Sequence, residues 1–347
     1  QSLGAIGVTG TSAANIISRD ADLVICIGTR LSDFTTASKT LFKNSNVTFL
    51  SINVSSFDAH KHSSFSLVGD AKACLEKLKE MLEEESLTTH QKYKSEIIQQ
   101  KNNWDQEVNK IFNKNNKPIV SQGEVIGVIS DFMNKDDTVV GAAGSLPGDM
   151  HKLWRTENGD QYHMEYGYSC MGYEIAGGLG IRMAKDLGDV FVMIGDGSYL
   201  MMNSEIVTAV QENQKLIIIL VNNHGFGSIN NLSLSLGSKG FGNQYRRRVT
   251  ETGEYTGDKI PVDYAAHAKA MGIDAKKVQT KQELGKALDL ARKNKTSIMI
   301  EVLVDPSVGV PGYESWWDVP VAEVSQSDSV VKTRKKYEQQ IKNERDF

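Results

Sequence analysis

Short apolar runs alternate along this chain with longer segments whose apolar residues recur at helical spacing. The apolar runs are rich in β-branched residues and bounded by polar turns, as in ADLVICIGTR at 21–30, VTFLSINV at 47–54, VFVMIG at 190–195 and KLIIILVNN at 215–223. Strands that alternate with helices pair in parallel, because each helix must cross over the sheet. We therefore expect an α/β fold with doubly wound parallel sheets.

The pattern divides the chain into two such domains. At 347 residues there is room for both, and the alternation is interrupted between about Leu75 and Lys117, where the residues become polar and charged at helical spacing. The sequence predicts a partial domain at 1–85, a helical linker at 86–117, a second domain at 118–310 and a C-terminal tail at 311–347. Because the chain begins with Gln1 in a glycine-rich segment, we expect an N-terminal part to be missing.

Composition narrows the class of partner. A net charge of -4 and a pI near 6.0 offer no basic surface for nucleic acid. No apolar stretch approaches the roughly 20 residues of a membrane span, and no signal peptide is visible. Three cysteines, far apart and without metal-ligand spacing, fit a reducing compartment. We expect a cytoplasmic protein that binds a small molecule and neither nucleic acid nor membrane.

Three loops follow predicted strands, where open α/β sheets bind ligands. These loops are GAAGSLPGD at 141–149, GDGS at 195–198 and VNNHGFGSIN at 221–230. The second and third place Asp196 and Asn223 at the ends of two strands that are one crossover apart. A carboxylate, an amide oxygen and a backbone carbonyl make half of an octahedral shell, which suits Mg²⁺ that also keeps water and phosphate oxygens. Either motif alone predicts only a turn, but the pair predicts a metal-bridged diphosphate site.

The same spacing resembles the cofactor domain of thiamine-diphosphate-dependent enzymes, whose signature is GDG, some two dozen residues, then NN. The resemblance implies thiamine diphosphate and Mg²⁺ as cofactors, with the metal on Asp196, Asn223 and the carbonyl of Gly225. The segment YSCMGYEIAGG at 168–178 resembles the one that places an apolar side chain under the bent cofactor. The residues implied in cofactor binding are Gly144, Ser145, Ser169, Met171, Gly197, Ser198, Gly225 and Gly227.

Four further stretches resemble one branch of this family, the hydrolases that open a cyclic polyol-derived dione in myo-inositol catabolism. They are GTRLSDFTTASKT at 28–40, YHMEYGYSCMGYEIAGG at 162–178, NNHGFGSINNLS at 222–233 and ESWWDVPVAEVS at 314–325. The resemblance implies hydrolysis of a carbon–carbon bond in a ketonic substrate, and a homodimer or homotetramer of full-length subunits. It also implies an activating glutamate in an N-terminal domain that these residues do not contain.

Several alternatives stay open at this stage. An acetohydroxyacid synthase-like carboligase or a 2-oxo-acid decarboxylase shares the metal motif, and a non-catalytic regulatory subunit would keep the fold without turnover. A flavin in the first domain is a further possibility that GTRLSDF does not decide. His163 and His224 are candidates for substrate contact or proton transfer, with a structural histidine as the alternative for each. Met171 at helical spacing is otherwise a core residue.

Overall fold

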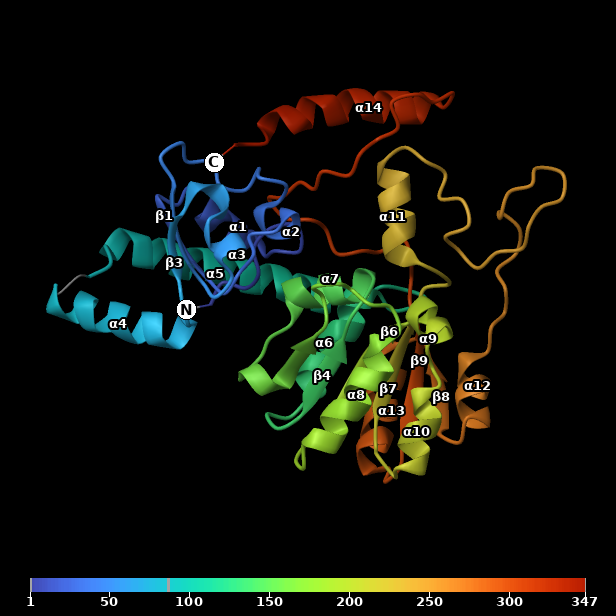
Figure 1. Ribbon diagram of the computed structural model, residues 1–347. Helices are drawn as coiled ribbons and strands as arrows, with labels where there is room; N and C mark the ends of the chain where they lie inside the picture. The colour runs from blue at the N-terminus through green and yellow to red at the C-terminus, as the bar shows by residue number, and fades with distance from the viewer. Residues whose placement is uncertain (1, 86–87, 347) are drawn as a thin grey trace. The chain divides into compact units, whose positions relative to one another are not determined.

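The chain forms two compact units in the computed structural model, which describes residues 2–85 and 88–346 (Figure 1). Unit 1 comprises Gln1–Val108, Pro311–Ser325 and Val331–Phe347, and unit 2 comprises Asn109–Val310 and Gln326–Val330. Most of the predicted C-terminal tail thus packs with the first domain. The predicted linker, residues 86–117, falls largely on helix α5 (Gln91–Phe112), and residues 86 and 87 lie outside the described residues. The domain boundaries stay a prediction.

Unit 1 is built on a short parallel sheet. Within the described residues it has three strands in the order β1-β2-β3, namely β1 (Leu23–Ile27), β2 (Thr48–Asn53) and β3 (Phe65–Val68). Cys26, Phe42 and Phe49 belong to its buried core. Its helices are α1 (Ser12–Arg19), α2 (Asp33–Thr36), α3 (Ser56–Ala59), α4 (Ala71–Glu84), most of α5 (Gln91–Phe112) and most of α14 (Asp328–Gln340).

Unit 2 is built on a larger parallel sheet, whose described strands follow the order β5-β4-β6-β7-β9-β8. Strands β6 and β7 lie in its middle and are buried on both faces, which is why their sequences are continuous apolar runs. They pair from Phe191 opposite Ile217 to Gly195 opposite Val221. The strands are β4 (Thr138–Gly141), β5 (Tyr162–Met164), β6 (Val190–Gly195), β7 (Ile217–Asn222), β8 (Asp274–Val278) and β9 (Ile298–Leu303).

Helices cover both faces of this sheet (Figure 1). On one face α8, α10 and α12 pack against a core that includes Val192, Leu220 and Met299. On the other face α6, α7 and α13 pack against one another and against β6 and β9. The helices of unit 2 are α6 (Gln122–Phe132), α7 (Ser145–Leu153), α8 (Tyr173–Ala184), α9 (Asp196–Met201), α10 (Glu205–Gln211), α11 (Gly227–Ser235), α12 (Tyr264–Ala270) and α13 (Lys281–Lys293).

The α/β class with parallel sheets, expected from the alternation of strand and helix patterns, is confirmed. Among the helices formed by the described residues, none combines the length and the apolar character that crossing a bilayer requires.

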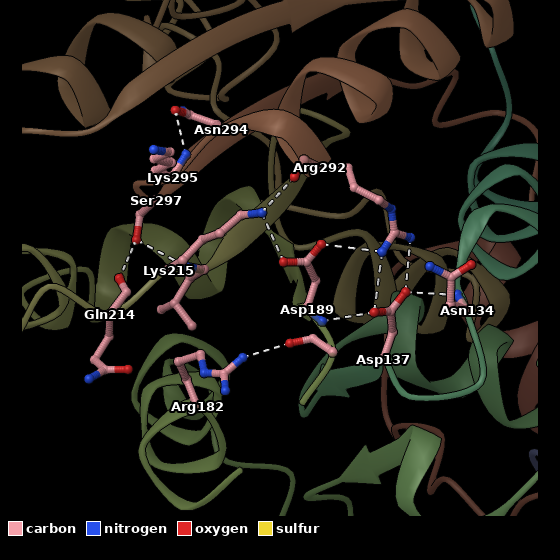
Figure 2. A network of polar contacts seen from close by, with 12 residues as sticks. Asn134, Asp137, Arg182, Asp189, Gln214, Lys215, Arg292, Asn294, Lys295 and Ser297 are labelled. Carbon is pink, nitrogen blue, oxygen red and sulfur yellow. Dashed lines mark hydrogen bonds and ion pairs between the residues drawn. The ribbon is translucent and has the colours of Figure 1, made fainter. Parts of the chain in front are cut away.

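Charged side chains join the amino ends of the strands in unit 2 (Figure 2). Asp137 precedes β4, Asp189 precedes β6 and Lys215 precedes β7. Arg292, near the end of α13, donates to Asp137 at 2.9 Å and to Asp189 at 3.2 Å, and Lys215 lies 2.8 Å from Asp189. Asp137 is only 1% exposed and also accepts from the backbone N–H groups of Asn134 and Asp189. This network ties α13 to two strands at the edge of the sheet away from the loops that follow β4, β6 and β7.

Replacing Arg292 by alanine should destabilise unit 2 by about 3–5 kcal/mol, because the buried Asp137 carboxylate loses the cation that compensates its burial. Urea unfolding followed by circular dichroism measures this loss. The matched control is Lys239→Ala, which removes an exposed ion pair with Glu254 and should change stability by no more than roughly 0.5 kcal/mol. A loss below 1 kcal/mol for Arg292→Ala would show that the network does not hold the sheet edge.

Candidate functional site

A cavity of about 250 Å³ opens at the carboxyl edge of the unit 2 sheet. The chain leaves β4 toward β5 on one side and leaves β6 toward β7 on the other, so the loops that follow β4 and β6 diverge. Every residue that the sequence predicts for cofactor or metal binding lines this cavity. They are Gly144, Ser145, Ser169, Met171, Asp196, Gly197, Ser198, Asn223, Gly225 and Gly227.

Asp196 places a buried carboxylate directly after β6. It follows the last residue of β6, begins α9 and has no exposed surface. Its oxygens accept from the N–H groups of Gly197 at 3.1 Å and Gly225 at 2.9 Å. Burial raises the pKa of the carboxyl to about 7, although these N–H groups favour the charged form. Within the described part of the chain no Lys or Arg side chain pairs with it, so a bound cation would compensate its charge.

The two asparagines at the carboxyl end of β7 have different surroundings. Asn222 donates to Glu301 at 2.9 Å and accepts from the N–H of His224 at 3.1 Å, which fixes the turn. Asn223 Oδ1 is buried and has no hydrogen-bond partner among the described residues. An unpaired buried amide oxygen is costly unless a ligand satisfies it. Together with the Asp196 carboxylate, it fits a hard divalent cation.

The groups that could serve as metal ligands indicate what kind of cation would bind here. Among the described residues no group of three or more His, Cys, Asp or Glu side chains could hold a metal ion. A cation here would be held by one carboxylate and by neutral oxygens, so ligands from a second molecule would have to complete its shell. Mg²⁺ is commonly bound in this way, by few carboxylates together with substrate phosphates and water.

Gly144 and Gly227 are glycines for different reasons. Gly144 precedes α7 with φ of +99°, and nothing lies within 4 Å of the position that a Cβ would take. The backbone there can approach a ligand closely, which fits a diphosphate. At Gly227 a Cβ would come within 2.7 Å of the Asn223 amide nitrogen, so the glycine leaves room for the Asn223 side chain.

Met171 and Ser169 lie in the turn before α8. The Met171 methyl group reaches to 3.4 Å from the position of a Cβ on Gly197, so the side chain lies against the turn that holds Asp196. Neither candidate histidine is among the described residues that line the cavity, although His224 stands between Asn223 and Gly225, which do line it. His163 Nε2 is 2.7 Å from the Tyr173 hydroxyl, and the two rings stack. A catalytic role for His163 or His224 stays a prediction.

Sequence reasoning missed several residues of the site. Phe226 and Ile229 add apolar surface to the cavity, and Gln122 at the start of α6 borders it. Gln122 donates to the buried Asp149 at 2.7 Å, a contact that joins residues 27 positions apart and has no local signal. Glu174 is 1% exposed and bonds to the cavity loops. The sequence could have indicated Glu174, because it is the only charged residue within YSCMGYEIAGG.

Helix α7 begins at the end of the loop after β4, which lines the cavity. Aromatic contacts connect α7 to the segment before α8. The half-buried ring of His151 lies 4.5 Å from the ring of Tyr166, centroid to centroid, and 6.1 Å from that of Tyr162. Burial lowers the pKa of His151 to about 4. The neutral imidazole is therefore the form that packs between the two segments.

Comparison with known proteins places these features in a family. Residues 142–302 match the thiamine pyrophosphate enzymes, C-terminal TPP binding domain, and residues 1–78 match the central domain of the same enzymes. The chain belongs to the thiamine pyrophosphate enzymes, and the cavity lies in the part that matches their cofactor-binding domain.

The chain is similar to several proteins named 3D-(3,5/4)-trihydroxycyclohexane-1,2-dione hydrolase. It is 44% identical to the one from Clostridium botulinum strain Alaska E43, with 99% of this chain and 57% of that protein aligned. The identity is 43% to the protein of Bacillus anthracis strain CDC 684 and 40% to that of Clostridium tetani strain Massachusetts, each over 98% of this chain and 56% of the relative. The chain thus spans somewhat over half the length of these relatives.

The pH dependence of stability tests the packing of His151. Its ordinary pKa is 6.5 and its folded pKa is about 4, so the unfolded chain binds the proton first as the pH falls. Stability should be fully present above pH 6.5 and should drop by up to about 3 kcal/mol between pH 6.5 and pH 4. His151→Phe keeps a ring and should reduce this drop, as measured by urea unfolding at several pH values. An equal drop in the variant would show that His151 is already protonated when folded.

Proposed function

We propose that these two domains belong to an enzyme that opens 3D-(3,5/4)-trihydroxycyclohexane-1,2-dione by hydrolysis to 5-deoxy-D-glucuronate, a step of myo-inositol degradation. The main support for the cofactor chemistry is the cavity beside the open turn at Gly144, where the Asp196 carboxylate and Asn223 Oδ1 lie without an ionic or hydrogen-bonded side-chain partner among the described residues. The choice of substrate is supported by the names of relatives that are 40–44% identical over nearly the whole chain.

In this proposal the cation is Mg²⁺, held by the Asp196 carboxylate, Asn223 Oδ1 and the Gly225 carbonyl. The backbone at Gly144 and Ser198, with the hydroxyl of Ser145, holds the diphosphate of thiamine diphosphate. Amide groups at the starts of the two helices that follow these loops favour an anion, as helix N-termini do.

The remaining lining residues fit the aromatic part of the cofactor. Met171 supports it from the turn before α8, with the Ser169 carbonyl as a hydrogen-bond acceptor, and Phe226 and Ile229 exclude water. When bound, thiamine diphosphate supplies a nucleophilic carbon and an electron sink for cleaving a bond beside a carbonyl. The residues of this chain bind and orient it in a dry pocket.

The net reaction balances as a hydrolysis. The bond between the two ring carbonyl carbons breaks, the hydroxyl of water joins one carbon as a carboxylate, and a proton joins the other to leave an aldehyde. No carbon is released. The protein would act in the cytoplasm as a homo-oligomer, a proposal supported by the family resemblance.

Asp196 is the only charged residue among the described residues that line the cavity, so its loss should matter most. Asp196→Ala in the full-length protein should abolish Mg²⁺-dependent binding of thiamine diphosphate, and Asn223→Ala should weaken it by roughly tenfold or more. Isothermal titration calorimetry measures both. Asp289→Ala is the control, because it removes an exposed carboxylate from α13 of the same unit. Near-wild-type affinity in Asp196→Ala would refute the site.

Solvent labelling tests the reaction itself. The full-length protein, given the cyclic dione, Mg²⁺ and thiamine diphosphate in water enriched in ¹⁸O and deuterium, should form a six-carbon open-chain product. Mass spectrometry should find one solvent oxygen in the new carboxylate and one deuterium on the aldehyde carbon, without CO₂. A reaction without enzyme corrects for carbonyl exchange. Release of CO₂ from pyruvate, with the dione untouched, would instead favour the carboligase or decarboxylase alternative.

A further inference from the structure

Glu174 joins three segments of the cavity through one buried carboxylate. It is the second residue of α8 and 1% exposed. One oxygen accepts from the N–H of Ala143 at 3.3 Å and the other from the N–H of Gly172 at 3.0 Å. The Ser198 hydroxyl also bonds to the carboxylate. The donors come from the loop after β4, the turn before α8 and the first turn of α9.

Each donor sits in or beside a residue of the proposed cofactor site. Ala143 precedes Gly144, and Gly172 follows Met171, while Ser198 lines the cavity itself. Ala143 and Ser198 belong to the end of the cavity proposed for the diphosphate. Gly172 belongs to the end proposed for the aromatic rings, and its φ of +94° marks the sharp turn that presents Met171. Glu174 therefore bonds to residues at both ends of the cavity.

No Lys or Arg among the described residues forms an ion pair with Glu174. Burial raises the pKa of its carboxyl, and the N–H and hydroxyl donors favour the charged form. All three partners can donate, and a carboxylate has only acceptors to offer. A glutamine would turn its NH₂ group toward one of these donors, and an aspartate, one methylene shorter, would not reach all three.

We propose that Glu174 is a positioning residue that couples the Met171 turn to the diphosphate loops, so that both ends of thiamine diphosphate are bound together. The inference rests on the proposed function, because it takes the cavity to be the cofactor site. It adds that the affinity for the aromatic rings depends on a group that the rings do not touch.

The test compares two probes, thiamine diphosphate and inorganic pyrophosphate, each titrated with Mg²⁺ into the full-length protein by calorimetry. The wild type should bind thiamine diphosphate more tightly, because the rings add contacts. Glu174→Gln should weaken thiamine diphosphate tenfold or more and pyrophosphate by a smaller factor, so that the ratio of the two affinities shrinks. Asp189→Asn, which removes a carboxylate from the opposite edge of the sheet, should lower stability and leave the ratio unchanged.

An unchanged ratio in Glu174→Gln, whether both affinities stay the same or fall together, would overturn the inference and leave the proposed function intact. A wild type that binds neither probe would refute the proposed function as well. Hydrogen exchange on the wild type covers the case in which the variant does not fold. The amide hydrogens of Ala143 and Gly172 should be protected without cofactor, and exchange as fast as in an unstructured peptide would also overturn the inference.

Discussion

The burial of one carboxylate at the end of β6 is the constraint on which the rest of the site depends. Asp196 is removed from water, held by backbone N–H groups from its own turn and from the loop after β7, and left without a cation by the described residues. Such a group costs free energy until a cation compensates it. In the proposed function, a cation that binds with a diphosphate gives the open turn at Gly144 and the Asn223 oxygen their roles.

Buried carboxylates have different partners at the two ends of the strands in unit 2, the amino edge and the carboxyl edge of the sheet. At the amino edge Asp137 and Asp189 are neutralised by Arg292 and Lys215, so the edge is complete in itself and contributes stability (Figure 2). At the carboxyl edge Asp196 and Glu174 accept hydrogen bonds from backbone N–H groups, and no Lys or Arg among the described residues pairs with either of them. Because all strands of this sheet are parallel, every loop that follows a strand lies at this second edge. The Asp196 and Glu174 carboxylates both lie there.

Much of the fold and of the candidate site could be predicted because it depends on residues that are close together in the sequence. The buried strands β6 and β7 are continuous apolar runs, and the spacing from Asp196 to Asn223 is one crossover. The edge strands β5 and β8 were not predicted, since YHM is short and DAKKV is mostly polar. The contacts of Gln122 and Glu174 were missed because they join loops that are distant in sequence, and only tertiary packing brings these together.

A crystal structure of the full-length protein grown with Mn²⁺ and thiamine diphosphate would locate the metal by its anomalous scattering. We expect one anomalous peak at about 2 Å from the Asp196 carboxylate, Asn223 Oδ1 and the Gly225 carbonyl, with two diphosphate oxygens completing part of the shell. A cofactor bound with its metal away from Asp196, or an Asn223 oxygen still without a partner in the bound state, would contradict this expectation.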